Sequence, residues 1–299
     1  MTVIQPRRGL ALRILRYPLT LLVLGFVLFT VIYGLVAVGA GTTPGLRGSP
    51  LQPLAVLAGA ALAVWLYKLF QRFVETREDA EFALAGAGAE LGRGLGIGFV
   101  LFCAVVLVTC LAGGMRIHGL GHGIGALWPM LTMAIISGLF EELLFRGIAF
   151  RQLEALLGSW AALALTSAFF GLAHIGNSGA SWFAAFAIAV EAGVLLGAAY
   201  MLTRRLWLAV GIHAAWNFTQ GWVFSVPVSG GRAAKGLLET SFAGPDWLTG
   251  GAFGLEASVV ALVLATATGL WLLRRTVQSD GLIAPAWQRK LGQNTGESE

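Results

Sequence analysis

Charged residues are scarce in this chain of 299 residues: Asp, Glu, Lys and Arg together make up 12% of it. Soluble domains carry about 25% charged and roughly 45–50% apolar residues. Here 57% are apolar, and the mean hydropathy is +0.78. This shortage of charge argues against a soluble enzyme, a disordered chain and a nucleic-acid-binding module. The formal net charge of +5 comes from basic residues beside apolar stretches, as in membrane proteins.

Cysteine is almost absent. Cys103 and Cys110 both lie in one apolar run, seven positions apart. On a helix that spacing places them about two turns apart on one face, which is too far for a disulfide. Two cysteines are also too few ligands for a metal site. We therefore interpret both as small packing or membrane-facing residues.

Long apolar runs occupy most of the chain. A helix needs about 20 mainly apolar residues to cross a bilayer, and we identify eight candidates, of which the fifth is short. The predicted spans are residues 19–40, 53–70, 95–111, 124–149, 160–174, 182–201, 206–224 and 255–273. We therefore predict an all-α fold, a polytopic membrane helix bundle of about eight transmembrane helices.

The remaining segments define the predicted domain organisation. Residues 1–18 form a basic N-terminus, 19–273 the transmembrane helical domain, and 274–299 a polar, disordered tail. The polar stretch 71–93 is predicted to contain an interfacial or extramembrane helix. Two Gly-rich connectors separate helices rather than domains, namely 113–125 and 225–251.

The distribution of Lys and Arg predicts the orientation. With eight spans both termini lie on one side, which collects 15 basic residues against four on the other side. The four are Arg47, Arg116, Arg232 and Lys235. The positive-inside rule therefore places both termini in the cytoplasm, with the chain in the plasma (inner) membrane. The basic residues before the first apolar run also resemble a signal peptide, but the length of that run favours a retained helix.

Ionisable residues inside the spans are few and fall almost entirely in spans four to seven. Such residues cost about 2.5–3.5 kcal/mol on insertion scales, so they usually face the bundle interior and serve a function. This set consists of Glu141, Glu142, Arg146, His174, Glu191 and His213, with the amide of Asn217. We expect the second half of the chain to form a polar cavity.

The spacing of these residues indicates which of them share a helical face. Glu142 and Arg146 are four residues apart, so they lie on one helical face and can pair. His213 and Asn217 have the same spacing and also share a face. Glu141 points about 100° away from Glu142, so it can face a cavity while its neighbour is tied to the arginine.

Such a set of groups is suited to hydrolysis. A carboxylate in a low-dielectric cavity can act as general base to a water. Neutral imidazole can share that water or bind a metal. Amide and imidazole N–H groups can stabilise a developing oxyanion.

Structural roles remain open for several of these polar and small residues. A membrane Glu–Arg pair or a buried histidine can serve packing alone. Glu191 either supports the site or pairs with a polar neighbour. His118 and His122 lie in a Gly-rich connector and are too few for a metal site, so we read them as a solvated loop. Gly193 and Gly197 form a GxxxG motif, which predicts close helix packing.

Three short motifs in order resemble the CPBP family of intramembrane proteases. That family includes the CAAX prenyl endopeptidases and the bacterial Abi or bacteriocin-processing proteins. Residues 141–146 (EELLFR) fit its EExxxR pattern, residues 170–174 (FGLAH) its FxxxH pattern, and residues 213–217 (HAAWN) its HxxxN pattern. The resemblance places a CPBP-like core at about 124–224.

The resemblance implies an eight-helix protease that cleaves peptide bonds near the membrane surface. By this analogy Glu141 and His174 activate the water, and His213 and Asn217 form the oxyanion side. Glu142 and Arg146 order the site. These six residues are the candidate catalytic set.

Metal dependence is left open by the residues. Two histidines and a glutamate match a zinc hydrolase ligand set, but no HExxH motif is present. A Zn²⁺ or other divalent ion, if used, would take Glu141, His174 and His213 as ligands. The expected partners are membrane lipid and a peptide or protein substrate, with or without lipid modification, and no nucleic acid.

The predicted topology contains one conflict. His174 ends its span on the side away from the termini, Glu141 lies near mid-membrane, and His213 lies about two turns from the cytoplasmic end. At 1.5 Å per residue these depths do not coincide unless the helices tilt or the span limits are wrong.

Three other interpretations compete with the protease. A transporter or proton-coupled channel also uses buried Glu, Arg and His, although no internal symmetry is visible. An inactive, immunity-type relative would retain the same motifs. A rhomboid-like serine protease is suggested by the GxSG at 176–179, but here it precedes the HxxxN, the reverse of the rhomboid order.

Overall fold

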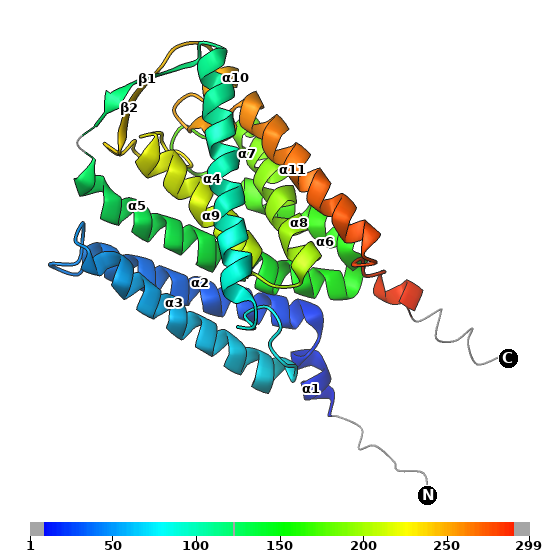
Figure 1. Cartoon of the computed structure of the whole chain (residues 1–299). Coiled ribbons are helices and arrows are strands. Elements are labelled where there is room, and N and C mark those ends of the chain that lie inside the picture. Colours follow the sequence, from blue (N-terminus) through cyan, green and yellow to red (C-terminus); the bar gives the residue numbers. More distant parts are fainter. Residues whose placement is uncertain (1–8, 122, 290–299) are drawn as a thin grey trace, which may run out of the picture.

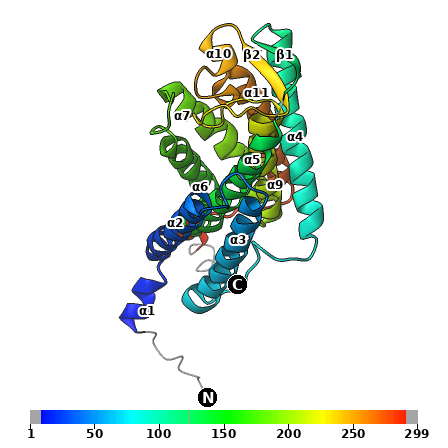
Figure 2. The same ribbon diagram turned by 90° about the vertical axis from the view of Figure 1, so that its left-hand side faces the viewer.

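The computed structural model describes residues 9–121 and 123–289, which fold as a helix bundle with a small two-stranded sheet (Figures 1 and 2). The first half contains α1 (Leu10–Leu15), α2 (Pro18–Thr42), α3 (Leu51–Leu69), η1 (Phe70–Glu75), α4 (Ala87–Leu111), β1 (Met115–Leu120), α5 (Ile124–Ile136), η2 (Ser137–Glu141) and η3 (Leu143–Phe150). The second half contains α6 (Arg151–Ala173), α7 (Trp182–Ile188), η4 (Ala189–Gly193), α8 (Val194–Thr203), α9 (Trp207–Phe218), η5 (Thr219–Val223), β2 (Leu238–Phe242), α10 (Asp246–Thr249), η6 (Leu255–Ala257) and α11 (Val259–Gln278). The predicted all-α class is confirmed.

Six helices of the described chain are long and apolar enough to cross a membrane. One of them, Ile124–Ala173, is a run of 50 residues that turns at Gly158, where φ is 78°. Only glycine adopts this backbone conformation readily, so the run consists of two helices in space. The helix from α9 through η5 is shorter than the other spans. The described residues therefore contain six candidate spans, and the number of eight stays a prediction.

Glycines bring the central helices into close contact. A side chain at Gly94 would meet the backbone of Gly211, and one at Gly98 would meet Ile212. These contacts join α4 to α9, which pack closely against each other (Figure 2). Gly193 and Gly197 likewise abut side chains of α6, which confirms the close packing predicted from their spacing.

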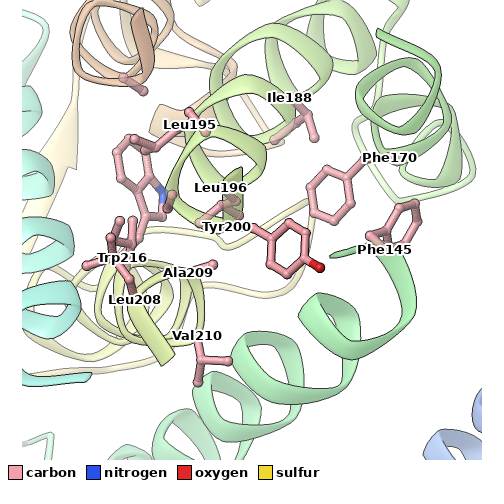
Figure 3. Close-up of a cluster of buried hydrophobic side chains, with 14 of the residues drawn as sticks. Phe145, Phe170, Ile188, Leu195, Leu196, Tyr200, Leu208, Ala209, Val210 and Trp216 are labelled. Carbon is pink, nitrogen blue, oxygen red and sulfur yellow. The ribbon is translucent and has the colours of Figure 1, made fainter. Parts of the chain in front are cut away.

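Large apolar side chains fill the centre between η3, α6, α8 and α9 (Figure 3). The rings of Phe145 and Phe170 meet edge to face at 4.8 Å, and Phe150 packs on Tyr200 at 5.5 Å. Trp216 extends the cluster toward α4 through Phe102, at 5.2 Å. This packing holds the helices that carry the polar residues in fixed register.

Arg and Glu side chains form a network at one end of the bundle, which we call the termini end. The termini end comprises α1, residues 76–86, the turn between α8 and α9, and residues 279–289 (Figure 1). Arg151 pairs with Glu75 at 2.6 Å, Arg77 with Glu81 at 2.6 Å, and Arg204 with Glu154 at 2.6 Å. The buried carboxylates are thereby neutralised.

Two sequence predictions at the termini end are wrong. The stretch 71–93 contains no interfacial helix of its own among the described residues, because η1 ends the helix Leu51–Glu75 and α4 begins at Ala87. The tail does not begin at 274, because α11 runs to Gln278 and Ile283 exchanges hydrogen bonds of 2.8–2.9 Å with Ser159. Arg7, Arg8 and Lys290 lie outside the described residues.

The opposite end of the bundle carries the small sheet. The two Gly-rich connectors were predicted only to separate helices, but β1 and β2 within them pair antiparallel, with Met115 opposite Phe242. His118 is exposed on β1, as expected for a solvated segment, and its Nε2 lies 2.7 Å from the hydroxyl of Ser241. His122 lies outside the described residues.

Candidate active site

The EExxxR segment lies where the long helix beginning with α5 takes π-helical geometry in η2 and η3. π-Helical turns are frequent at functional sites. Gly138 in η2 lets α9 approach, since a Cβ there would lie 2.8 Å from that of Ala214. This contact brings Glu141 and Glu142 beside His213.

Glu142 is the centre of a buried ionic network. Its Oε1 accepts hydrogen bonds from Arg146 Nη1 at 2.9 Å and from His213 Nδ1 at 2.8 Å. The Glu142 side chain is fully buried, and that of Arg146 is 2% exposed. Arg146 Nη2 also donates to the carbonyls of Ala192 and Gly193 at 3.2 Å. The predicted pairing of Glu142 with Arg146 is thus present, and it extends to α9 and η4.

Glu141 has a different environment. Its side chain is 20% exposed and lines a cavity of ≈ 370 Å³, and its Oε2 lies 3.9 Å from His213 Nε2. At that separation the two atoms are not hydrogen-bonded. The cavity is lined by Tyr33, Met133, Ile136, Ser137, Glu141, His174, Asn177, Ser178, His213, Asn217, Val228, Ser229, Gly230 and Gly231.

His174 caps the C-terminus of α6 and reaches the same cavity. Its Nδ1 lies 2.7 Å from the carbonyl of Phe170, and because a carbonyl accepts, Nδ1 carries the proton. Nε2 is therefore the ring atom left for chemistry in the cavity. The Phe170 ring lies 4.9 Å from His174 and 6.1 Å from His213, with the Arg146 guanidinium 5.0 Å from its centre.

Asn217 completes the polar wall one turn beyond His213. Its Nδ2 donates to the hydroxyl of Ser137 at 2.8 Å, which leaves the second amide hydrogen for another acceptor. Ser137 and Tyr33 line the cavity but were not among the predicted site residues. A tyrosine with a polar tip inside the apolar run 19–40 is the signal that could have indicated Tyr33.

Glu141, His174 and His213 meet at one cavity, so the conflict in their predicted depths came from the predicted span limits. Glu141 and His174 stand 17 and 16 residues from the turn at Gly158, and helices of that length are each roughly 25 Å long. α9 begins inside the bundle. The side chain of Leu206, which precedes α9, lies 3.3 Å from where a Cβ atom would stand at Gly147 in η3. His213 therefore reaches the level of Glu141 after only two turns.

Whether the cavity fits a metal ion depends on how its His and Glu side chains are arranged. Among the residues that the structure describes, no group of three His, Cys, Asp or Glu side chains is arranged to hold one. Nδ1 of His213 is bound to Glu142 and Nδ1 of His174 to its own helix, so only the two Nε2 atoms are left to hold an ion together with Glu141. The predicted ligand set thus shares a cavity without forming a metal-ligand geometry.

A second, smaller cavity of ≈ 40 Å³ lies behind the two histidines. Glu191 and Glu256 both line it and are each 2% exposed. Glu191 Oε2 has no hydrogen-bond partner among the described residues, whereas Glu256 accepts a hydrogen bond from the backbone of Ser229. Burial raises the pKa of Glu256 above its ordinary value, and the bond from Ser229 opposes that shift. Glu256 was not among the predicted site residues.

The fold and this cavity define an integral membrane helix bundle with a buried Glu/His/Asn site. Residues 123–219 match the family model described as type II CAAX prenyl endopeptidase Rce1-like. The match spans all three motifs over about a third of the chain, and it confirms the predicted resemblance to the CPBP/CAAX proteases. At family level this match supports a CAAX-type intramembrane protease. No curated protein and no solved structure matches the chain.

Proposed function

We propose that this chain is an intramembrane endopeptidase that hydrolyses a peptide bond near the membrane surface, with a glutamate as general base. The observation that carries the proposal is the divided environment of two adjacent carboxylates. Glu142 is fully buried and neutralised by Arg146 and His213, whereas Glu141 faces the cavity without a hydrogen bond from either. Two titratable groups with contrasting surroundings are typical of paired roles in catalysis.

In the proposed reaction Glu141 takes a proton from a water in the cavity. The water oxygen attacks the carbonyl carbon of the scissile peptide bond, and His174 Nε2 orients the water. Glu141 then returns the proton to the leaving amine as the C–N bond breaks. Carboxylate and imidazole groups placed in this way contribute about 10²–10⁴-fold as a general base.

His213 and Asn217 are proposed to stabilise the oxyanion that forms during attack. The remaining amide hydrogen of Asn217 is a donor toward the cavity. Because His213 Nδ1 already donates to Glu142, Nε2 donates only in the imidazolium form. Loss of one such donor typically lowers the rate about 10²–10³-fold.

Glu142 and Arg146 are proposed to position these groups rather than to contact substrate. Glu142 holds the His213 ring through Nδ1, and Arg146 ties η3 to η4 through two backbone carbonyls. The substrate is proposed to be a membrane-associated peptide or protein, and a prenyl group on it is the family-based alternative to an unmodified chain.

Cleavage by the full chain in proteoliposomes tests the proposal. The substrates are quenched peptides with a C-terminal CAAX sequence, prenylated or unmodified, and products are identified by mass spectrometry. Glu141→Gln and His174→Ala should each lower turnover at least about 10²-fold. Ser178→Ala and His118→Ala are controls that should retain turnover. Loss of turnover with Ser178→Ala alone would indicate a serine protease. Solute flux without any cleavage product would overturn the proposal in favour of a transporter.

A further inference from the structure

A cleft of ≈ 760 Å³ lies between α4, α8 and α11, at the termini end and apart from the cavity of Glu141. In Figure 1, α4 and α11 diverge toward the ends that carry Ala87 and Gln278. The walls are apolar, with Ile97, Val100 and Leu101 on α4. These walls belong to helices long and apolar enough to span a membrane, so the cleft opens toward lipid.

Two arginines stand at the polar end of this cleft. Arg93 lies in the second turn of α4 and Arg275 in the last turn of α11, and both are exposed. Within the described residues neither forms a salt bridge. The acidic residue of the lining, Glu90, is paired with Arg205 at 3.3 Å. The Arg275 guanidinium lies 5.3 Å from the ring centre of Trp271, which also lines the cleft.

We propose that this cleft binds one anionic phospholipid, with an acyl chain along the walls of α4 and α11. Its phosphate would lie between Arg93 and Arg275. Basic pockets between membrane helices bind anionic head groups, and tryptophan is favoured at head-group level. A zwitterionic lipid would bring a cationic group to the same two arginines. The proposal does not depend on the catalytic roles given above.

Native mass spectrometry of the full chain in detergent tests this site. Phosphatidylglycerol and phosphatidylcholine with identical chains are titrated separately, and the lipid-bound fraction is measured. Wild type should retain phosphatidylglycerol selectively. Arg93→Gln with Arg275→Gln should weaken its retention ~30-fold, from the loss of two basic contacts. Arg13→Gln with Arg72→Gln removes the same charge from exposed positions at the same end and should retain the lipid.

A second pair of variants tests the cleft itself. Gly96 lines the cleft and Gly92 does not, and neither has any atom within 4 Å of an added Cβ. Gly96→Leu should therefore reduce lipid retention without disturbing helix packing, while Gly92→Leu should not. Equal retention of both lipids by wild type would overturn the proposal. So would unchanged retention in Arg93→Gln with Arg275→Gln, or equal loss in its charge-matched control.

Discussion

Replacement of Arg146 tests whether the buried network supports both the fold and the site. In Arg146→Met the fully buried Glu142 loses its guanidinium, and the carbonyls of Ala192 and Gly193 lose their donor. Removing one partner of a buried ion pair costs about 3–5 kcal/mol. We expect the lower end, near 3 kcal/mol, because His213 still donates to the same carboxylate oxygen.

The assay is thermal unfolding of the full chain in detergent, with cleavage measured in parallel. A loss of about 3 kcal/mol in a chain of this size corresponds to a Tm lower by on the order of 5–10 °C. Arg146→Lys should also destabilise, because an ammonium lacks the planar fork that reaches both Glu142 and η4. Glu142→Gln combined with Arg146→Met should recover part of the loss, since no buried charge then remains unpaired.

Three results would refute this reasoning. The first is a Tm of Arg146→Met within 1 °C of wild type. The second is an Arg146→Lys variant as stable and active as wild type, which would mean that a point charge suffices. The third is a double variant, Glu142→Gln with Arg146→Met, whose loss of stability equals the sum of the losses in the two single variants. Arg13→Gln, on exposed α1, is the control for nonspecific loss of charge.

Three further predictions concern protonation, metal and orientation. The pKa of Glu256 is raised in the fold, so above the ordinary pKa of about 4.3 the folded state binds more protons than the unfolded state, and stability falls as pH rises. Glu256→Gln should therefore raise Tm at pH 8 more than at pH 5. An equal rise in Tm at both pH values would contradict this prediction. Proteolysis should persist after treatment with a strong chelator, whereas loss that only added Zn²⁺ restores would establish a metal. In a variant lacking the native cysteines, Arg232→Cys should react with an impermeant maleimide in intact cells and Arg72→Cys should not; the reverse would place the termini outside the cytoplasm.

The candidate site could be predicted largely from local sequence. The four-residue spacings of Glu142 with Arg146 and of His213 with Asn217 place each pair on one face of any helix. The angle between Glu141 and Glu142 likewise depends only on helix geometry. Polar residues in a chain so poor in charge are conspicuous, because each one in a span is costly.

The sequence by itself therefore determined the membrane class, the helical composition and the candidate polar residues, four of which line one cavity. Only the tertiary structure decided their meeting at one depth, through the turn at Gly158 and the entry of α9 beside Gly147. The pairing of β1 with β2 and the position of Glu256 behind the histidines were also undetermined, since both join segments distant in the chain. Periodicity reports which residues share a face of one helix, whereas depth and contact between helices depend on how side chains and backbones pack.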